Sequence, residues 1–150
     1  TISYKDLLFS VFQIQNKFRN EMRPTGGLLR TREFIMKDLY SFHSSKTDAL
    51  NFYEKVKKAY FRVFRRCGLN VICVEADSGT IGGELSHEFM VISERGEDEI
   101  LVCESCKWAG NIEKLKNIKK CPQCKKKLNI FSSIEVGHTF YLGEKYSQAM

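Results

Sequence analysis

The sequence predicts an α+β fold, in which an antiparallel sheet is accompanied by one crossing helix and a small inserted zinc ribbon. Most of the regular segments are short runs rich in Phe, Val and Ile, which is typical of strands. One segment repeats apolar residues every three or four positions, which is typical of an amphipathic helix. Two Cys-x-x-Cys pairs lie close together in the second half. This order of elements favours α+β over alternating βαβ units.

The first third of the chain predicts two strands joined by a loop. Residues 7–17 form the first expected strand, and residues 28–42 form the second. Between them, residues 23–27 include one Pro and two Gly, which break regular structure and predict a loop or hairpin turn. In the second strand, alternation places two sets of side chains on opposite faces. These sets are Phe34, Met36, Asp38 and Tyr40 on one face, and Ile35 and Leu39 on the other.

A helix that ends near Arg66 is the most regular prediction. Ser44, Ser45 or Thr47 can cap its N-terminus, and Gly68 can close it. Its expected apolar stripe is Leu50, Tyr53, Val56, Tyr60, Val63 and Cys67. Beyond the helix, short strands are expected at 70–75, 88–93 and 99–102, with a Gly-rich turn at 77–84. A short helix is possible at 111–116, and a last strand at 130–142 should bend at Gly137.

The two cysteine pairs predict one structural zinc site. Thiolates with this spacing can close a tetrahedron around one ion, and four of them leave no open position for water or substrate. The predicted ligands are Cys103, Cys106, Cys121 and Cys124. The remaining cysteines, Cys67 and Cys73, are expected to be small buried hydrophobes, and His87 and His138 are expected to be hydrogen-bonded sheet residues.

Composition restricts the class of protein. The 150 residues suit one domain of ordinary size, and their net charge of +6 suits a polyanionic partner. Lysines flank the second cysteine pair, and further Lys and Arg residues lie on the predicted helix. A solvated basic face and a nucleic-acid surface both explain them. The absence of a long apolar run predicts no membrane span, and metal-ligating cysteines suit a reducing compartment.

Four residues around the first loop combine into a possible nucleotide site. The strands would bring Arg19, Glu21, Arg30 and Phe34 near one another. A guanidinium matches two phosphate oxygens, a carboxylate can accept from an exocyclic amine, and a Phe ring can stack on a purine. Together they predict a site for ATP. An ordinary hairpin with surface salt bridges explains the same residues.

Several sequence blocks carry a resemblance to a known family. They are Lys17-Phe18-Arg19-Asn20-Glu21-Met22-Arg23-Pro24, Arg32-Glu33-Phe34-Ile35-Met36-Lys37-Asp38, Gly82-Gly83 with Ser86-His87-Glu88-Phe89, and Ile134-Glu135-Val136-Gly137-His138-Thr139-Phe140. The first two, with Arg30, resemble motif 2 of the class II aminoacyl-tRNA synthetases. The whole set resembles the prolyl-tRNA synthetases of bacterial type. The resemblance implies a central part of the catalytic core: core segment 1–98, zinc-ribbon insertion 99–130 and return strand 131–150.

The resemblance also implies a role for each motif 2 residue. Arg19 would be the catalytic residue that holds the α-phosphate of ATP and the substrate carboxylate. Glu21 would contact the adenine amine, Arg30 the γ-phosphate, and Phe34 the adenine ring. Arg23 would face the acceptor stem of tRNA. The implied reaction uses ATP with Mg²⁺ to make prolyl-adenylate from proline, and then transfers the prolyl group to tRNA(Pro), in a homodimer of the full-length parent.

Four departures from the family pattern bear on this expectation. Motif 1, the Thr-x-Glu loop that reads proline, motif 3 and the anticodon-binding domain have no counterpart here. The short interval that holds the cysteines replaces the editing domain, so hydrolysis of mischarged alanine is not expected. The loop reads Arg23-Pro24-Thr25-Gly26 where the family usually has Arg-Pro-Arg-Phe-Gly, which removes a possible acceptor-stem contact. Glu144 stands where Thr is usual and alters the charge near the proline pocket.

Two further alternatives stay open. The chain could be a non-catalytic zinc-containing module that binds tRNA or protein, whereas a generic zinc-ribbon protein leaves the Arg-x-Glu segment unexplained. Trp108 and the nearby lysines could contact tRNA, or the cysteine module could simply be a staple. The compact form without an editing domain is similar to mitochondrial and some bacterial prolyl-tRNA synthetases. The expected location is therefore the bacterial cytoplasm, with the mitochondrial matrix as the alternative.

Overall fold

The structure is a computed structural model that describes residues 3–113, 115 and 118–148. It divides into two compact units, Thr1–Ala49 and Leu50–Met150. The division expected from the sequence, at residues 98 and 130, was based on sequence motifs, whereas these two units are defined by their compactness. The motif-based division stays a prediction. Among the described residues, no helix is both long and apolar enough to cross a bilayer.

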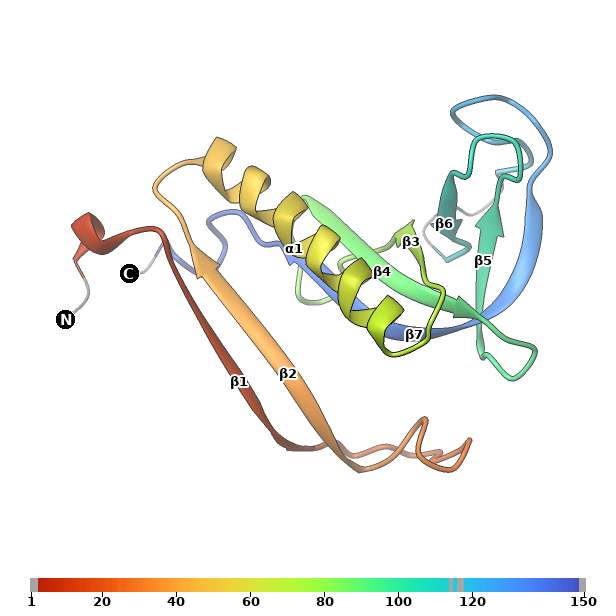
Figure 1. Ribbon diagram of the computed structural model, residues 1–150, viewed down its shortest axis with the longest axis horizontal. Helices are drawn as coiled ribbons and strands as arrows, with labels where there is room; N and C mark the ends of the chain where they lie inside the picture. The colour runs from red at the N-terminus through yellow and green to blue at the C-terminus, as the bar shows by residue number, and fades with distance from the viewer. Residues whose placement is uncertain (1–2, 114, 116–117, 149–150) are drawn as a thin grey trace. The chain divides into compact units, whose positions relative to one another are not determined.

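The first unit is a long β-hairpin (Figure 1). After a short 3₁₀ helix at Tyr4–Asp6, strand β1 (Phe9–Phe18) pairs antiparallel with β2 (Glu33–Phe42). Their register runs from Phe9 opposite Phe42 to Phe18 opposite Glu33. The second strand begins five residues later than predicted. Residues 25–30 instead form a turn of their own, with a bridge between Thr25 and Arg30 and two glycines at positive φ.

The two faces of this hairpin differ in their contacts. On one face, Asp38 accepts hydrogen bonds from Gln13 and Lys17, each at 3.0 Å. These contacts hold the pKa of Asp38 below its usual range, the Gln13 bond first. The other face leaves large apolar side chains exposed. They are Phe12, Ile14, Phe18 and Ile35, with 65–74% of their surface exposed. We call this set the apolar hairpin face.

The second unit contains a small closed barrel beside most of helix α1 (Lys46–Arg66). Its strands are β3 (Ile72–Glu75), β4 (Leu85–Ile92), β5 (Asp98–Val102), β6 (Ala109–Asn111) and β7 (Asn129–Tyr141), in the order β3-β4-β7-β5-β6. Neighbours are antiparallel, as predicted, except for the parallel contact of β3 with β6 at Glu75 and Gly110. Strand β6 was not predicted, because its three residues are all buried and show no alternation.

Helix α1 begins and ends as its sequence predicts. The backbone N–H of Asp48 donates to Oγ of Ser45 at 3.3 Å, which identifies Ser45 as the cap. At the other end Gly68 has φ 77°, and the N–H groups of Gly68 and Leu69 donate to the carbonyls of Arg65 and Phe64. This is a Schellman motif, in which glycine supplies the left-handed residue.

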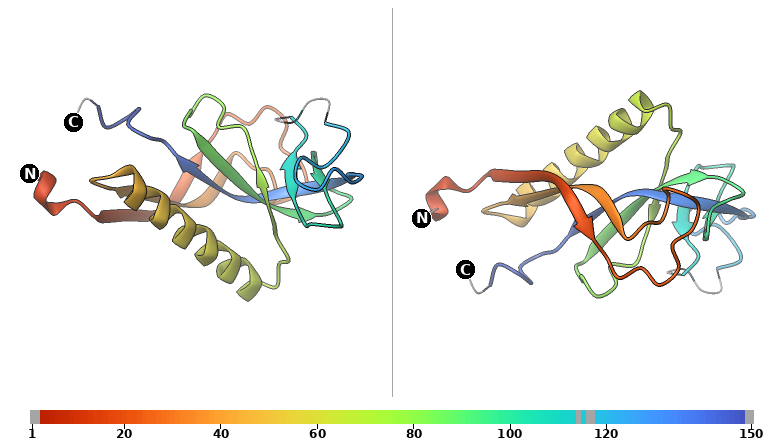
Figure 2. Two further views of the ribbon diagram at one scale, coloured as in Figure 1. Left: turned by 90° about the horizontal axis from the view of Figure 1, so that it is seen from above. Right: turned by 90° about the horizontal axis from the view of Figure 1, so that it is seen from below.

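The buried face of α1 differs from the predicted stripe. Phe89 of β4 contacts the rings of Tyr60, Phe61 and Phe64, with centroids 5.1–5.7 Å away, and Figure 2 shows the helix running along this part of the barrel. Val63 is 51% exposed and Cys67 is also exposed, so both assignments to the stripe, and the burial of Cys67, were wrong. Val63 and Cys67 lie at one edge of the apolar side of α1, and Phe89 packs against the residues toward the opposite edge.

The predicted bend in the last strand is confirmed. The register of β7 against β4 shifts between Phe89 and Met90, which face Gly137 and Glu135, so Val136 is the extra residue. A Cβ atom at Gly137 would lie 2.9 Å from the ring of Phe64. Glycine therefore allows α1 to approach the sheet. Of the short helix considered at 111–116, Asn111 belongs to β6, residues 112, 113 and 115 form turns, and 114 and 116 lie outside the described residues.

A buried tyrosine joins α1 to the sheet. The hydroxyl of Tyr53 lies 2.8 Å from Nδ1 of His87 and accepts a hydrogen bond from Oγ1 of Thr139 at 3.1 Å. Burial raises the pKa of Tyr53 to about 12, so the hydroxyl stays protonated.

Removing this hydroxyl should destabilise the protein. We expect Tyr53→Phe to lower the free energy of unfolding by about 1–2 kcal/mol, because polar atoms of His87 and Thr139 lose a buried partner. Denaturant unfolding measures the change. Tyr40→Phe is the matched control, since Tyr40 is 50% exposed. Equal stability of Tyr53→Phe and Tyr40→Phe would show that the buried contacts contribute nothing.

Candidate functional site

The loop end of the hairpin contains the four residues predicted for a nucleotide site, and they form two contacting pairs. The guanidinium of Arg19 lies over the ring of Phe34, with Cζ 5.2 Å from the ring centroid. The backbone supports this contact, because the N–H of Arg19 donates to the carbonyl of Arg32 at 2.9 Å and so extends the strand pairing. The pair presents a cation and an aromatic face at the same place.

The second pair, Glu21 and Arg30, is held by the turn at the tip of the loop. Nε of Arg30 donates to Oε2 of Glu21 at 2.8 Å, and the backbone N–H of Arg23 donates to Oε1 at 3.0 Å. Nε of Arg32 donates to the backbone carbonyl of Glu21. The Arg23 N–H, followed by Arg30, holds the pKa of Glu21 below its usual value, so the carboxylate is an ionised acceptor. The Arg23 residue itself is exposed.

This geometry is chemically suited to a nucleotide. Two guanidinium groups can each hold phosphate oxygens through paired N–H donors, and the Phe34 ring can stack on a base. The Glu21–Arg30 contact is also the surface salt bridge that an ordinary hairpin would have. Geometry therefore brings the predicted residues together, and their assignment to ATP remains a proposal.

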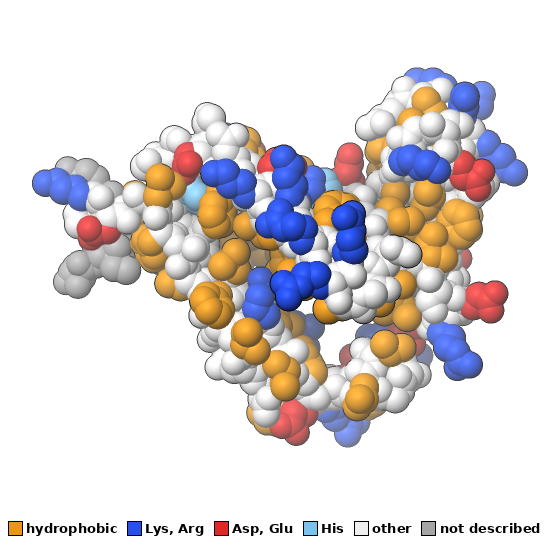
Figure 3. Space-filling model, in the orientation of Figure 1, with side chains coloured by type: hydrophobic (Ala, Val, Ile, Leu, Met, Phe, Trp, Pro, Cys, Tyr) orange, Lys and Arg blue, Asp and Glu red, His pale blue; other side chains and the backbone are white. Residues whose placement is uncertain are grey.

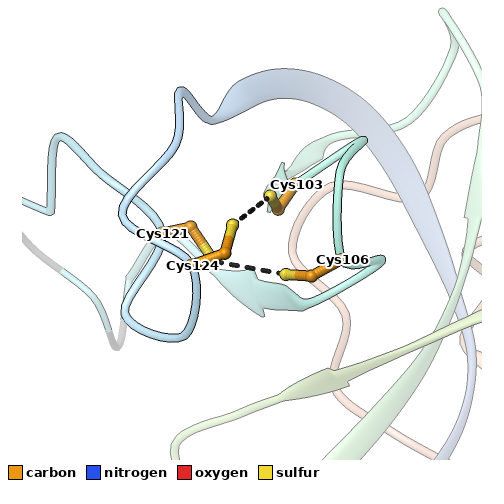
Figure 4. A group of neighbouring side chains, drawn as sticks. All are labelled: Cys103, Cys106, Cys121 and Cys124. Carbon is orange, nitrogen blue, oxygen red and sulfur yellow. Dashed lines mark hydrogen bonds between the residues drawn. The ribbon is translucent and has the colours of Figure 1, made fainter.

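The four predicted metal ligands converge in the second unit. Their sulfur atoms all lie within 4.8 Å of one another, with Cys103 Sγ 3.4 Å from Cys124 Sγ and Cys106 Sγ 3.5 Å from Cys121 Sγ (Figure 4). A tetrahedron with Zn–S bonds of about 2.3 Å has sulfur–sulfur edges of about 3.8 Å. All four cysteines are free thiols. The donor set and its spacing thus fit a structural zinc ion.

Each cysteine pair belongs to a tight backbone turn of the same shape. The backbone N–H of the first cysteine donates to the carbonyl of the residue five positions later: Cys103 N–H to Trp108 O, and Cys121 N–H to Lys126 O, both at 2.8 Å. The fifth residue of each turn is a lysine in the left-handed region, Lys107 with φ 62° and Lys125 with φ 61°. Backbone N–H groups, that of Cys106 first, lower the pKa of Cys103 to about 6, which favours the thiolate that binds metal. We call these turns the first and second knuckle.

Trp108 is largely buried. It is only 8% exposed and packs in a cluster with Leu101, Leu128 and the buried cysteines. Most of the indole fills the small core between the knuckles, and a contact of Trp108 with tRNA stays a prediction. Glu144, the departure at the end of the chain, is exposed.

A third cluster escaped prediction as a possible site. Glu88 of β4 lies directly opposite His138 of β7, and Nδ1 of His138 lies 3.4 Å from Oε1 of Glu135. His138 also contacts Oγ of Ser86 at 2.6 Å, and His87 contacts Tyr53, so both histidines are hydrogen-bonded sheet residues as predicted. Only the strand register could have revealed the cluster, because its members are about fifty residues apart in the sequence.

Glu88 titrates abnormally in this cluster. Burial raises its pKa above the usual value, and the nearby Glu135 adds to the effect, although Asn111 donates a hydrogen bond to Oε2 at 2.9 Å. The folded state thus binds the proton more tightly than the unfolded state. Glu88 therefore lowers stability as pH rises through the window above its ordinary pKa, and the cost is absent at lower pH.

The variant Glu88→Gln should remove this cost. The amide keeps the shape and can still accept from Asn111, but it never ionises. We expect a higher melting temperature than that of the natural protein at pH 7–8, and a difference that vanishes below about pH 4. Melting curves across this range provide the measurement. A difference that does not change with pH would contradict the assignment to Glu88 ionisation.

Comparison with known proteins gives one family and many relatives. Residues 2–150 match the family model described as tRNA synthetase class II core domain (G, H, P, S and T). The chain is 60% identical over 112 residues to a proline–tRNA ligase of Prochlorococcus marinus, covering 75% of the chain and 19% of that protein. It is 45% identical to a proline–tRNA ligase of Sulfurimonas denitrificans, covering 99% of the chain and 39% of that protein. A human protein named "Probable proline--tRNA ligase, mitochondrial" is 48% identical, covering 97% of the chain and 31% of that protein.

Proposed function

The chain belongs to the class II tRNA synthetase core domain family, and from this membership we propose that it is the ATP-handling part of a proline–tRNA ligase. The observation that carries the proposal is 45–60% identity to proline–tRNA ligases over 75% or more of the chain. Because the chain spans about a fifth to two fifths of those relatives, the proposed activity belongs to a longer protein.

The hairpin residues take distinct roles in this proposal. Phe34 stacks on adenine, Glu21 accepts from its exocyclic amine, and Arg30 binds the γ-phosphate. Two observations support these roles: Glu21 is an ionised acceptor, and Arg30 already lies beside it with half of its side chain exposed. Since the Arg19 guanidinium occupies one face of the Phe34 ring, adenine reaches that face only if Arg19 turns toward the phosphates. Arg23, exposed at the loop, is proposed to contact the tRNA acceptor stem.

The proposed chemistry is an in-line displacement at phosphorus. The carboxylate of proline attacks the α-phosphate of ATP and pyrophosphate leaves; a hydroxyl of the terminal ribose of tRNA(Pro) then attacks the prolyl carbonyl of the adenylate, and AMP leaves with the hydroxyl proton passing to solvent. Mg²⁺ that enters with ATP supplies charge neutralisation. Arg19 holds the α-phosphate and the proline carboxylate in line, and its charge stabilises the five-coordinate phosphorus. No side chain of the hairpin is needed as a base.

The cysteine cluster is proposed to be a zinc ribbon that acts as a structural staple. Cys103, Cys106, Cys121 and Cys124 would hold the ion and fix both knuckles against the strands of the barrel. Helix α1 is proposed to correspond to the crossing helix of the class II core. The longer protein is proposed to be a homodimer, in the bacterial cytoplasm or the mitochondrial matrix, since relatives named for both kinds of source occur.

Proline-dependent exchange of pyrophosphate into ATP tests the function. We expect exchange with the full-length protein, proline as the preferred amino acid, and none with the isolated 150 residues. Adenine on Phe34 would lack the arginine of motif 3 on its second face, and misalignment alone can lower a rate about a hundredfold. If the full-length protein shows no exchange while tRNA still binds, the chain is part of a non-catalytic module.

A further inference from the structure

The exposed side of α1 carries a row of cationic side chains. Each lies three or four positions from another member of the row, so they lie along one side of the helix. The row, which we call the helix stripe, consists of Lys55, Lys58, Arg62, Arg65 and Arg66. All five are exposed. Within the part of the chain that the structure describes, none of them forms an ion pair or a side-chain hydrogen bond.

The helix stripe is not neutralised by its own helix. Residues 54–66 contain six basic residues and one acidic residue, Glu54, and Glu54 pairs with Lys57 at 3.1 Å. Like charges three or four residues apart repel one another, whereas a solvated helix surface usually alternates its signs. A bound polyanion would remove this repulsion.

A second cationic group lies on the two knuckles. Residues 103–129 contain eight lysines and two glutamates. The described lysines of this segment are all exposed, and we call them the knuckle lysines: Lys107, Lys119, Lys120, Lys125, Lys126 and Lys127. The net charges of residues 54–66 and 103–129 add up to more than the +6 of the whole chain, so the remaining residues carry a net negative charge. The positive charge is therefore concentrated in these two segments.

One residue of each cationic group borders a common cleft. A cavity of about 370 Å³ is lined by Lys58 of the helix stripe and Lys107 of the knuckle lysines, together with Lys57, Phe61 and Trp108 and with the carboxylates Glu54 and Glu75. In Figure 3, Lys and Arg side chains gather over α1 and again over the knuckles. A single extended ligand could therefore reach both groups.

We propose that the helix stripe and the knuckle lysines form one binding surface for the phosphate backbone of RNA. The stripe extends about 16 Å along the helix axis, long enough to meet several successive phosphates. An anionic membrane is a poorer match, because an interfacial helix must place its apolar face in the lipid. The apolar face of α1 is instead packed on Phe89. The proposal rests on the proposed function in one respect: it takes tRNA as the RNA that is bound.

Charge-neutralising variants of the full-length protein test this surface. The stripe variant is Arg62→Gln with Arg65→Gln, and the knuckle variant is Lys126→Gln with Lys127→Gln. The control, Lys5→Gln with Arg95→Gln, removes the same charge from exposed positions elsewhere. Fluorescence anisotropy gives the affinity for a proline tRNA transcript and for an unrelated hairpin RNA between 50 and 250 mM salt. At about 100 mM salt, we expect each test variant to bind both RNAs about tenfold more weakly. The slope of log K against log salt should fall by about 1.5–2.

Three results would overturn the proposal: an unchanged salt slope in both test variants, an equal loss of affinity in the control, or stripe-dependent binding to phosphatidylserine vesicles without binding to RNA. Proline-dependent pyrophosphate exchange needs no RNA and is measured on the same proteins. Exchange without stripe-dependent RNA binding leaves the proposed function standing and refutes this inference. If RNA binding depends on the stripe but the natural protein shows no exchange, this inference stands and the proposed function is refuted.

Discussion

Replacing Arg19 by alanine in the full-length protein should lower proline-dependent pyrophosphate exchange by at least two orders of magnitude. In the proposed mechanism, the guanidinium makes charge-assisted hydrogen bonds that strengthen as the α-phosphorus becomes five-coordinate. Losing such a group removes on the order of 3 kcal/mol of transition-state stabilisation. The loss should therefore appear mainly in kcat rather than in the KM for ATP.

Two further variants make this expectation specific to Arg19. Arg19→Lys keeps the charge but loses the planar fork, so exchange should recover only in part. Arg95→Ala removes an exposed arginine from the turn between β4 and β5 and should leave exchange unchanged. Exchange near the natural level in Arg19→Ala would show that Arg19 lies outside the reacting site, even though it contacts Phe34.

Loss of zinc should unfold the knuckles and leave the rest of the second unit folded. We expect metal analysis of protein purified without chelator to give one zinc per chain, and Cys121→Ser to abolish it. The segment buries only a few apolar side chains, among them Leu101, Trp108 and Leu128. Binding of structural zinc contributes about 10–16 kcal/mol in small zinc-finger peptides, so this small core should not hold the knuckles without the ion. Hydrogen exchange should then become fast in the two knuckles, residues 103–108 and 121–126, and stay slow in the barrel strands.

Cys67→Ser is the matched control for the zinc ligands. Cys67 is exposed after the end of α1 and takes no part in the cluster. This variant should keep one zinc and the natural exchange pattern. Zinc content near zero in the natural protein, or a disulfide among the four cysteines in freshly reduced protein, would contradict the site.

The sequence predicts those features of the fold that depend on neighbouring residues. The cap at Ser45, the end at Gly68, the two knuckles and the bend at Gly137 each follow from the local chemistry of one or two residues. The convergence of the four cysteines was predictable for the same reason, because the two Cys-x-x-Cys pairs are visible in the sequence, and their binding of zinc stays a prediction. The hairpin register shows why Arg19 and Phe34, 15 positions apart, meet, whereas the roles that resemblance gives them stay predictions.

Features that depend on distant partners could not be predicted. Phe89, a residue of another element, decides that Phe61 rather than Val63 of α1 packs against the sheet. Strand β6 is buried on all sides and lacks the alternation by which strands are recognised. The pairing of Glu88 with His138 requires the register of β4 and β7, including the extra residue Val136. A one-residue error in that register would place the two side chains on opposite faces.

The apolar hairpin face links the proposed nucleotide site to any surface that covers this face. A two-stranded ribbon is at best marginally stable alone in water, and this ribbon leaves Phe12, Ile14, Phe18 and Ile35 exposed. Arg19, Glu21 and Arg30 at its end keep their arrangement only while the ribbon is ordered. Any surface that buries the apolar face should therefore raise the affinity for ATP, and bound ATP should raise the affinity for that surface by the same factor. Binding of a partner surface to the apolar hairpin face and binding of ATP at the loop end would then each strengthen the other.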